Sequence, residues 1–285
     1  MTERPRVLVV AGYDQSGGAG VLADVKTLEA HGVYAYAVCT AFTFQNERVI
    51  RRVEWFPEED ILEQIDLCFA VASFDWVKIG IVRSVEMMQR IIRHLRTHNP
   101  SIRIVLDPVI RASSGMDFWE SGNRTGAQFR GAEAGQAPED RGARTVRRSR
   151  WSDGGDFGEV AARCYLLTPN WEEIGWLYPG KDIAEQCREL TRSAGCNLYL
   201  KGGHNPVSPG RDFLWMDGEV QALDPGVEPM AVFPKHGSGC VLSSSLAGNL
   251  ALGYTLPVAA ALSKRYIEQF LTSNKTLLGW HHCIS

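Results

Sequence analysis

The sequence has no long apolar segment and no strong excess of charge of either sign. Its 285 residues include 30 Lys and Arg against 33 Asp and Glu, which gives a formal net charge of -3. A balance this even, without a basic cluster, disfavours nucleic acid and acidic membrane surfaces as partners. The start of the chain, Met1–Arg6, leads directly into Val7–Val10, an apolar run too short for a signal peptide or a membrane span. We therefore expect a cytoplasmic protein without nucleic acid or membrane partners.

Closely spaced cysteine pairs are also absent. The seven cysteines are scattered along the chain, and none forms a C-x-x-C motif. This spacing gives no indication of a zinc site, and it is typical of thiols that stay reduced. The run His281-His282-Cys283 could ligate a metal, but near a chain end such residues usually form a solvated tail.

Apolar runs of strand length alternate with segments of helical period. The expected strands are Val7–Ala11, Ala35–Ala41, Trp76–Ile81, Ile102–Leu106, Tyr165–Thr168, Leu198–Lys201 and Met230–Phe233, with a hairpin at Phe213–Val220. The expected helices are Val21–Ala30, Ile61–Val71, Val85–Leu95, one from near Asn170, Cys240–Leu252 and Leu256–Ser273. Because the strands read as continuous apolar runs, they should be buried on both faces of a mainly parallel sheet. The sequence predicts an α/β protein with three layers, α-β-α, in a single domain over residues 1–285.

One long segment breaks this alternation. Residues 122–158 are rich in Gly, Arg, Asp, Glu and Ser and have almost no aliphatic side chains. Such a composition cannot bury enough apolar surface to fold alone. We expect an irregular or disordered insertion here, with a mobile lid or a locally altered reading frame as the alternatives.

A glycine-rich loop, Gly12–Gly20, follows the first expected strand and precedes a helix. Its glycines allow a substrate to lie close to the backbone, and the amides at the helix start favour an acceptor or an anion. The loop lacks the Gly-Lys-Ser/Thr ending of a P-loop. Gly18, Gly20 and Ala23 imitate a dinucleotide fingerprint, but the acidic residue expected after the second strand is missing. Nicotinamide binding is therefore a weak alternative.

A second glycine motif, His236-Gly237-Ser238-Gly239-Cys240, opens a later helix. The amides of Gly237, Ser238, Gly239 and Cys240 could converge on the oxygens of a transferring phosphoryl group. Cys240 would stand at the positive end of the helix, which lowers the pKa of a thiol and favours the thiolate. The alternative for Cys240 is a small buried residue without a chemical role.

Polar residues follow two further expected strands. Asn170 and Glu173 come after Tyr165–Thr168, and Lys201 ends the strand Leu198–Lys201. Ligands of open parallel sheets bind beyond the carboxyl ends of the strands. An acid near Mg²⁺ and a lysine near a triphosphate would serve phosphoryl transfer, although Asn170 and Glu173 alone could be ordinary first-turn helix residues.

Seven motifs occur in an order that resembles one enzyme family. They are Gly12–Gly20 with Ala23-Asp24, Thr43-Phe44-Gln45-Asn46, Lys78-Ile79-Gly80, Leu106-Asp107-Pro108-Val109, Leu167-Thr168-Pro169-Asn170, Lys201-Gly202-Gly203-His204 and Gly237-Ser238-Gly239-Cys240. In this order they resemble the hydroxymethylpyrimidine/phosphomethylpyrimidine kinases of thiamin biosynthesis, which have a ribokinase-like fold. The resemblance fails through roughly residues 117–161.

The resemblance implies a site for a pyrimidine. The family pocket corresponds here to Gly12, Asp24, Gln45, Ile81 and Val109. Gln45 is the sharpest expectation, because an amide offers both a donor and an acceptor to an aminopyrimidine edge.

The resemblance also implies ATP and Mg²⁺. The nucleotide side would use Asn170, Glu173, Lys201 and Lys264, with Asp107 and Glu173 near Mg²⁺. The expected reaction phosphorylates 4-amino-5-hydroxymethyl-2-methylpyrimidine and then its monophosphate. Cys240 would accept the hydroxyl proton in the first transfer, whereas the second acceptor is already ionised. A homodimer is a further implication of the family.

Two alternatives remain open at this point. Pyridoxine and pyridoxal also present a hydroxymethyl group on a nitrogen ring, and neither Gln45 nor Cys240 separates these substrates from a pyrimidine. A protein that binds the pyrimidine or vitamin without turnover is the non-enzymatic alternative, against which the intact Lys201 and Glu173 argue.

Overall fold

The computed structural model describes residues 3–110, 118, 157–178, 180–228 and 231–283. The strands are β1 (Arg6–Asp14), β2 (Tyr34–Gln45), β3 (Ile50–Trp55), β4 (Trp76–Ile79), β5 (Arg103–Leu106), β6 (Leu166–Leu167), β7 (Asn197–Leu200), β8 (Asp212–Met216) and β9 (Glu219–Leu223). The helices are α1 (Gly20–Ala30), α2 (Glu58–Phe69), α3 (Val85–His98), α4 (Phe157–Ala161), α5 (Trp171–Leu177), α6 (Ile183–Ala194), α7 (Ser238–Ala251) and α8 (Leu256–Thr272).

The strands form one sheet in the order β3-β2-β1-β4-β5-β6-β7-β8-β9. Neighbouring strands from β2 through β7 pair in parallel, while β3 at one edge and β8 and β9 at the other pair antiparallel. The central strand β4 is buried at every position, as expected for a parallel strand covered on both faces. Both halves of the chain therefore contribute to a single, mainly parallel sheet.

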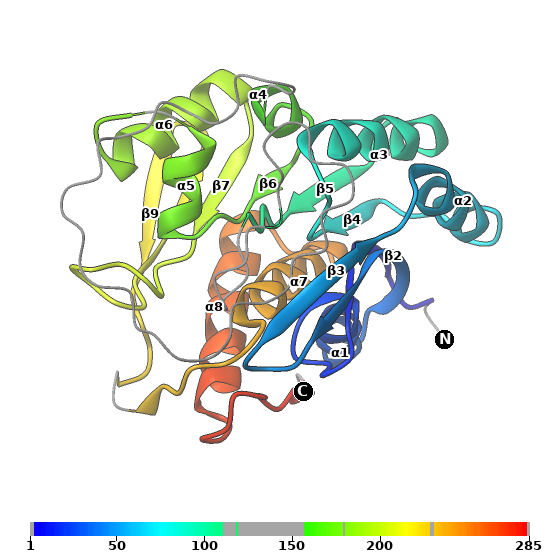
Figure 1. Cartoon of the computed structure of the whole chain (residues 1–285). Helices are drawn as coiled ribbons and strands as arrows, with labels where there is room; N and C mark the ends of the chain where they lie inside the picture. The colour runs from blue at the N-terminus through cyan, green and yellow to red at the C-terminus, as the bar shows by residue number, and fades with distance from the viewer. Residues whose placement is uncertain (1–2, 111–117, 119–156, 179, 229–230, 284–285) are drawn as a thin grey trace.

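Helices cover the two faces of the sheet as separate layers (Figure 1). On one face, α2 to α6 pack with the sheet around a core that includes Ile65, Ile92 and Leu190. On the other, α1, α7 and α8 enclose a second core that includes Leu28 and Leu246. The expectation of a three-layer α-β-α fold is confirmed.

The hairpin β8–β9 is closed by Asp217-Gly218, both with positive φ. This dipeptide is the strongest local signal for a tight hairpin turn, because both central residues need the left-handed conformation. The expected hairpin at Phe213–Val220 is thus confirmed, although its second strand continues to Leu223.

Other boundaries differ from the expectation. The prediction of a strand at Met230–Phe233 is wrong for residues 231–233, the part that the structure describes. These residues lie outside the sheet, and the backbone amide of Phe233 donates to Leu271 O (3.2 Å). That hydrogen bond ties the segment to the end of α8, so it does not extend the sheet edge. The sequence reading also missed β3 and α6.

The expected insertion, residues 122–158, lies outside the described residues except at its end. Phe157 and Gly158 begin the short helix α4, and Phe157, Val160 and Ala161 are buried in the core beside α3 and α6. The described end of the expected insertion, Phe157-Gly158, is therefore helical, because this apolar turn can bury its side chains.

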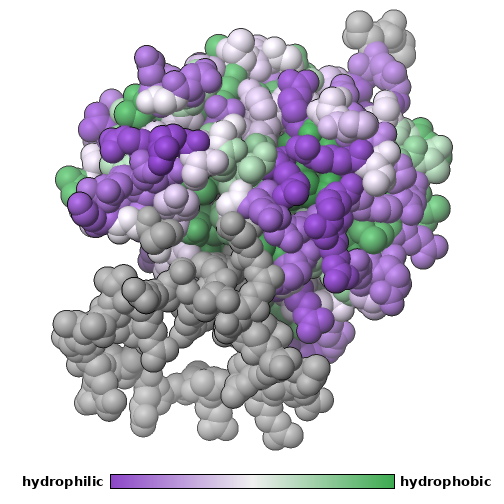
Figure 2. Space-filling model, turned by 90° about the horizontal axis from the view of Figure 1, so that it is seen from above, coloured by the Kyte–Doolittle hydropathy of each residue, from purple (hydrophilic) through white to green (hydrophobic). Residues whose placement is uncertain are grey.

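The surface seen from above the α2–α6 layer is mainly hydrophilic where it is described, with small hydrophobic areas between (Figure 2). Among the described residues, no helix combines the length and the apolar character that a bilayer crossing needs. All seven cysteines are free thiols.

Candidate active site

A cavity of about 260 Å³ opens at the carboxyl ends of the parallel strands. It brings together almost every residue that the sequence singled out. The predicted site residues that line it are Gly12, Gln45, Ile81, Asp107, Val109, Asn170, Glu173, Lys201, Gly237, Ser238, Gly239, Cys240 and Lys264. Asp24 is the exception, since it lies fully buried and outside the lining of the cavity.

The two glycine loops touch each other at the cavity. Gly237 has φ +74° and caps α7, and a Cβ placed there would overlap the carbonyl of Gly18. Beside this contact, His236 Nε2 lies 2.8 Å from Asp14 Oδ2. Both loops therefore need glycine for a close approach as well as for backbone conformation.

Asp14 organises the first loop. Its carboxylate accepts from the amides of Ser16 (2.9 Å) and Ala19 (2.9 Å) and from the Ser16 hydroxyl. Burial alone would raise the pKa of Asp14, but the hydrogen bonds from His236 and Ser16 outweigh it and hold this pKa below the usual range. The loop is thus built around a carboxylate that stays ionised.

The predicted substrate residues line the cavity at the ends of β2, β4 and β5. Gln45 is the last residue of β2, and Ile81 and Val109 follow β4 and β5 closely. A side chain at Gly12 would collide with Ile81, so the glycine leaves room for the Ile81 side chain at the cavity. Phe118 lines the cavity as well, and together these groups give one amide on an otherwise largely apolar wall.

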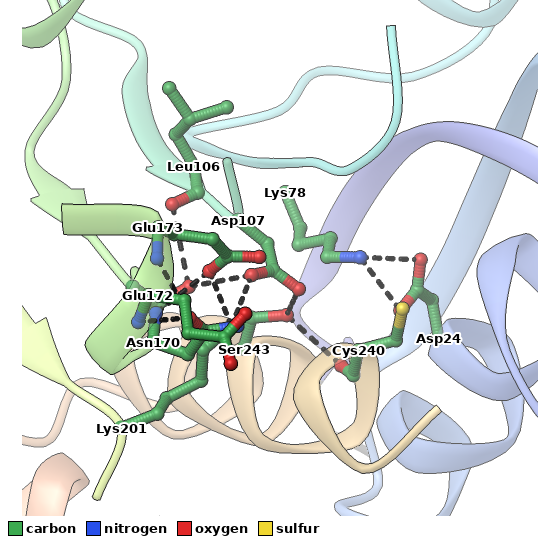
Figure 3. A network of polar contacts seen from close by, with 11 residues as sticks. Asp24, Lys78, Leu106, Asp107, Asn170, Glu172, Glu173, Lys201, Cys240 and Ser243 are labelled. Carbon is green, nitrogen blue, oxygen red and sulfur yellow. Dashed lines mark hydrogen bonds and ion pairs between the residues drawn. The ribbon is translucent and has the colours of Figure 1, made fainter. Parts of the chain in front are cut away.

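Just beyond the ends of β5, β6 and β7, a lysine bridges two carboxylates (Figure 3). Lys201 Nζ lies 2.7 Å from Asp107 Oδ1 and 3.6 Å from Glu173 Oε2. Burial opposes the charge on Lys201, but Asp107 and Glu173 outweigh it and raise the pKa of Lys201 above its usual value. The side chain keeps 12% of its surface exposed, so its ammonium group is charged and can be reached from the cavity.

Glu173 both caps a helix and places an ionisable carboxyl group at the cavity. Asn170 caps α5 and accepts from the amides of Glu172 and Glu173, while Glu173 Oε2 accepts from the Asn170 amide (2.7 Å). This capping box fixes both side chains at the cavity. Burial raises the pKa of Glu173 to about 7, even though Lys201 acts against the shift. The two roles weighed from the sequence, helix cap and site residue, are therefore compatible.

Lys264, assigned from helix position alone, reaches the same cavity from α8. Its Nζ lies 3.0 Å from Asp212 Oδ2 and 3.4 Å from Glu268 Oε1, and it also donates to Gly210 O. The lysine therefore stands fixed between two carboxylates at the rim beside β8.

Cys240 lies in the first turn of α7 (Ser238–Ala251), next to Lys78 and Asp24 (Figure 3). The expectation that the pKa of Cys240 is lowered is wrong. Burial raises the pKa of Cys240 to about 11, and the opposing effect of Lys78 is smaller. The thiol is consequently protonated at neutral pH.

Beneath Cys240 lies a buried ion pair that the sequence reading did not assign. Lys78 Nζ is 2.9 and 2.8 Å from the two oxygens of Asp24, and both side chains are fully buried. Ser244 Oγ also donates to Asp24 (2.7 Å). Burial disfavours the charge on Lys78, yet Asp24 overcomes this and raises the pKa of Lys78. Asp24 thus belongs to a fully buried ion pair beside Cys240, and its charge adds to the rise in the pKa of the Cys240 thiol.

Asp14, Lys78 and His236 also line the cavity; each lies in a motif that the sequence analysis quoted, but none was given a role there. A lysine inside the apolar strand Trp76–Ile79 is a signal that could have been used, because an unpaired charge is not tolerated there. The His236–Asp14 contact joins residues 222 positions apart, and no local pattern predicts it.

Comparison with known proteins connects this site to one family. The family model described as phosphomethylpyrimidine kinase matches residues 14–127 and 157–284. The chain is 33% identical over 271 residues to the thiamine biosynthesis bifunctional protein ThiED of Geobacter sulfurreducens, covering 93% of this chain and 48% of that protein. It is 30% identical over 273 residues to the hydroxymethylpyrimidine/phosphomethylpyrimidine kinase of Rhizobium meliloti, covering 93% and 90%. The chain spans a third to a half of the first several curated relatives, which are larger proteins.

Solved structures agree with the fold. The crystal structure of phosphomethylpyrimidine kinase from Clostridium difficile matches with TM-score 0.68 and 27% identity over 93% of this chain and 98% of that one. Pyridoxal kinase from Staphylococcus aureus matches with TM-score 0.71 at 18% identity, over 95% and 89%, which shows the shared fold alone. The ribokinase-like fold expected from the motifs is confirmed, and the chain belongs to the phosphomethylpyrimidine kinase family.

Proposed function

We propose that the protein is an ATP-dependent kinase that phosphorylates hydroxymethylpyrimidine and then its monophosphate. One observation carries the proposal: a single cavity is lined by Gln45 with apolar neighbours, by the glycine helix start Gly237–Cys240 and by the Lys201 cluster. Gln45 ends β2 and Lys201 follows β7, so four strands of the sheet separate them. Acceptor, transferring phosphoryl group and nucleotide would lie in that order. Because phosphoryl transfer depends mainly on positioning and charge neutralisation, this arrangement suits it. We also propose that residues 1–285 form one kinase domain.

The nucleotide side is supported by its charges. Lys201 and Lys264 bring two ammonium groups to the cavity, and the first-turn amides of α7 have no carbonyl partner within the helix. S. aureus pyridoxal kinase, which shares the fold, has been solved with ADP and with AMP-PCP. We infer that the triphosphate of ATP lies between these lysines and the start of α7.

The carboxylates fit a magnesium ion. Asp107 and Glu173 both line the cavity, and Mg²⁺ prefers carboxylate and phosphate oxygens. Burial raises the pKa of Glu173 to about 7, and a bound cation would favour its ionised form. When bound, Mg²⁺ would neutralise the charge on the phosphates.

Cys240 is the group placed to handle the substrate proton. A thiol with a pKa of about 11 cannot accept a proton, so a base must act through the minor thiolate form, which Lys78 favours. In that form Cys240 would take the proton of the hydroxymethyl group in the first transfer. The monophosphate is already ionised near neutral pH and needs no base, so the second transfer would not depend on Cys240 in this way.

The test is an ATP-consumption assay of purified protein with Mg²⁺ on four acceptors: hydroxymethylpyrimidine, its monophosphate, pyridoxine and pyridoxal. The Lys201→Met variant serves as the control for contaminating kinases. Turnover of the two pyrimidines, lost in the variant, is the expected result. Selective turnover of pyridoxine and pyridoxal would show that the substrate is a pyridine and not a pyrimidine. No turnover of any acceptor by folded protein would refute the kinase proposal. Light scattering on the same sample tests the predicted homodimer.

A further inference from the structure

A cluster of three potential metal ligands lies outside the candidate active site. Asp66 is in α2, and His94 and His98 are in α3 (Val85–His98). The Asp66 Oδ1 atom lies 2.6 Å from His94 Nε2 and 2.7 Å from His98 Nε2, and the three ligand atoms all lie within 4.8 Å of one another. Two imidazole nitrogens thus converge on one carboxylate.

The local structure explains why these groups meet. His94 and His98 are four residues apart in one helix, so their side chains lie on the same face. The imidazole of His98 stacks on Phe69, with ring centroids 4.5 Å apart and planes 9° apart, and the two imidazoles stand edge to face at 5.2 Å. This packing holds the His98 ring toward Asp66. The spacing H-x₃-H is itself a zinc-ligand pattern, which the sequence analysis did not assign.

From this arrangement we propose that Asp66, His94 and His98 bind one divalent transition-metal ion, with Zn²⁺ as the reference case. Zinc takes imidazole nitrogen at about 2.0 to 2.1 Å and carboxylate oxygen at about 2.0 to 2.2 Å. Tetrahedral ligands would therefore be about 3.3 Å apart. The observed separations of 2.6 and 2.7 Å require each side chain to move by only a fraction of an ångström. Side-chain exposures of 24%, 28% and 51% leave room for that movement.

The ligand set selects the class of metal. Two imidazoles and one carboxylate suit Zn²⁺, Ni²⁺, Co²⁺ or Cu²⁺, whereas Mg²⁺ and Ca²⁺ require mainly oxygen ligands. A neutral imidazole binds through the Nε2 lone pair once its proton stands on Nδ1. Three protein ligands leave the remaining coordination positions to water.

The position of the cluster separates it from the kinase chemistry. Asp66 and His98 are near the carboxyl ends of α2 and α3, which lead into the amino ends of β4 and β5. The candidate active site lies beyond the carboxyl ends of the parallel strands. The metal would therefore link α2 to α3 near the amino ends of β4 and β5. It would stabilise the fold and would not take part in phosphoryl transfer.

Calorimetric titration of EDTA-treated, tag-free protein with ZnCl₂ and NiCl₂ tests the proposal, with MgCl₂ as the negative control. One site per chain and a higher melting temperature with Zn²⁺ are expected. The His94→Gln/His98→Gln and Asp66→Asn variants should bind Zn²⁺ at least about tenfold more weakly. The control is His282→Gln/Cys283→Ser, which removes the exposed tail ligands and should leave binding unchanged.

Two results would overturn the site. Unchanged Zn²⁺ affinity in both cluster variants would show that other groups bind the ion, and so would loss of binding in the tail control. Circular dichroism of each variant shows that it is folded, and the partial exposure of all three side chains means that folding should survive. Kinase turnover should be the same in the cluster variants and the parent protein, so the outcome does not depend on the proposed activity.

Discussion

Two buried lysines, Lys78 and Lys201, stand near the ends of strands in the same sheet, and their surroundings differ. Lys78 is fully enclosed and pairs with one carboxylate, Asp24. Lys201 keeps contact with the cavity and faces two carboxylates, Asp107 and Glu173. The first cluster has equal numbers of opposite charges, and neither of its side chains is exposed. The second has a surplus of negative groups and an opening, which are the conditions under which a cation and a polyphosphate can bind.

The largest effect on stability should come from breaking the Lys78–Asp24 ion pair. Lys78→Met leaves Asp24 as a buried charge without its partner, and we expect the free energy of unfolding to fall by about 3 to 5 kcal/mol. Urea denaturation followed by tryptophan fluorescence measures this. The double variant Lys78→Met/Asp24→Asn should recover much of the loss, because the remaining amide still accepts from Ser244. A double variant no more stable than the single one would contradict a purely electrostatic cause.

The open cluster should respond in activity and much less in stability. Lys201→Met removes the charge that we propose contacts the phosphates of ATP, and turnover should fall by about 10²- to 10³-fold. Asp107 and Glu173 line the cavity, where water can replace the lysine, whereas Asp24 does not, so the carboxylates left behind cost less than Asp24 does in the Lys78 variant. Turnover and urea denaturation of the same sample give both values. A stability loss equal to that of Lys78→Met would remove the distinction between the clusters.

Cys240 lies between the two clusters and should distinguish the two phosphoryl transfers. For Cys240→Ala we expect the first transfer to slow by about 10²-fold, the scale of general base catalysis, and the second to change less than about tenfold. In the parent protein the first transfer should quicken as the pH rises from neutral, because the thiolate fraction grows toward a pKa of about 11. Equal losses on both acceptors would show that Cys240 only shapes the cavity.

The smallest effect concerns Glu173 in the absence of nucleotide and metal. Its folded pKa, about 7, is higher than the ordinary glutamate value of about 4.3, so its contribution to stability is full below the lower value. That contribution is lost as the pH rises through about 7. Glu173→Gln cannot ionise and retains an acceptor for the Asn170 amide. Melting temperatures between about pH 5 and pH 8 should therefore fall more in the parent than in the variant, and parallel curves would disprove the shift.

Much of this architecture could be predicted from the sequence. The alternation of apolar runs with helical periods predicted the layers, and the seven motifs predicted the lining of the cavity, because ends of parallel strands meet at one edge. The antiparallel strand β3 was missed because its sequence, Ile50–Trp55, carries exposed charged residues such as Arg51 and Arg52. Its position depends on pairing with the extended β2, which is a tertiary contact.

The sequence predicted which residues gather at the site better than it predicted their ion pairs and pKa values. Asp24 was expected to bind substrate, and the structure places it in the ion pair with Lys78; its contact with a substrate stays a prediction. For Cys240 the helix start suggested a lowered pKa, yet burial reverses the sign. Motif and spacing identify which residues gather, whereas the depth of burial and the distance to each partner exist only in the folded chain.

The contact between the glycine loops constrains how this protein can vary. A side chain acquired at position 237 would occupy the space of the Gly18 carbonyl, so the Gly12–Gly20 loop would have to retreat at the same time. A substitution in only one of the two loops would produce this steric clash, whereas compensating changes in both loops would avoid it. We expect these two positions, more than two hundred residues apart, to be inherited as one unit, and swapping either loop alone between relatives to give inactive chimaeras.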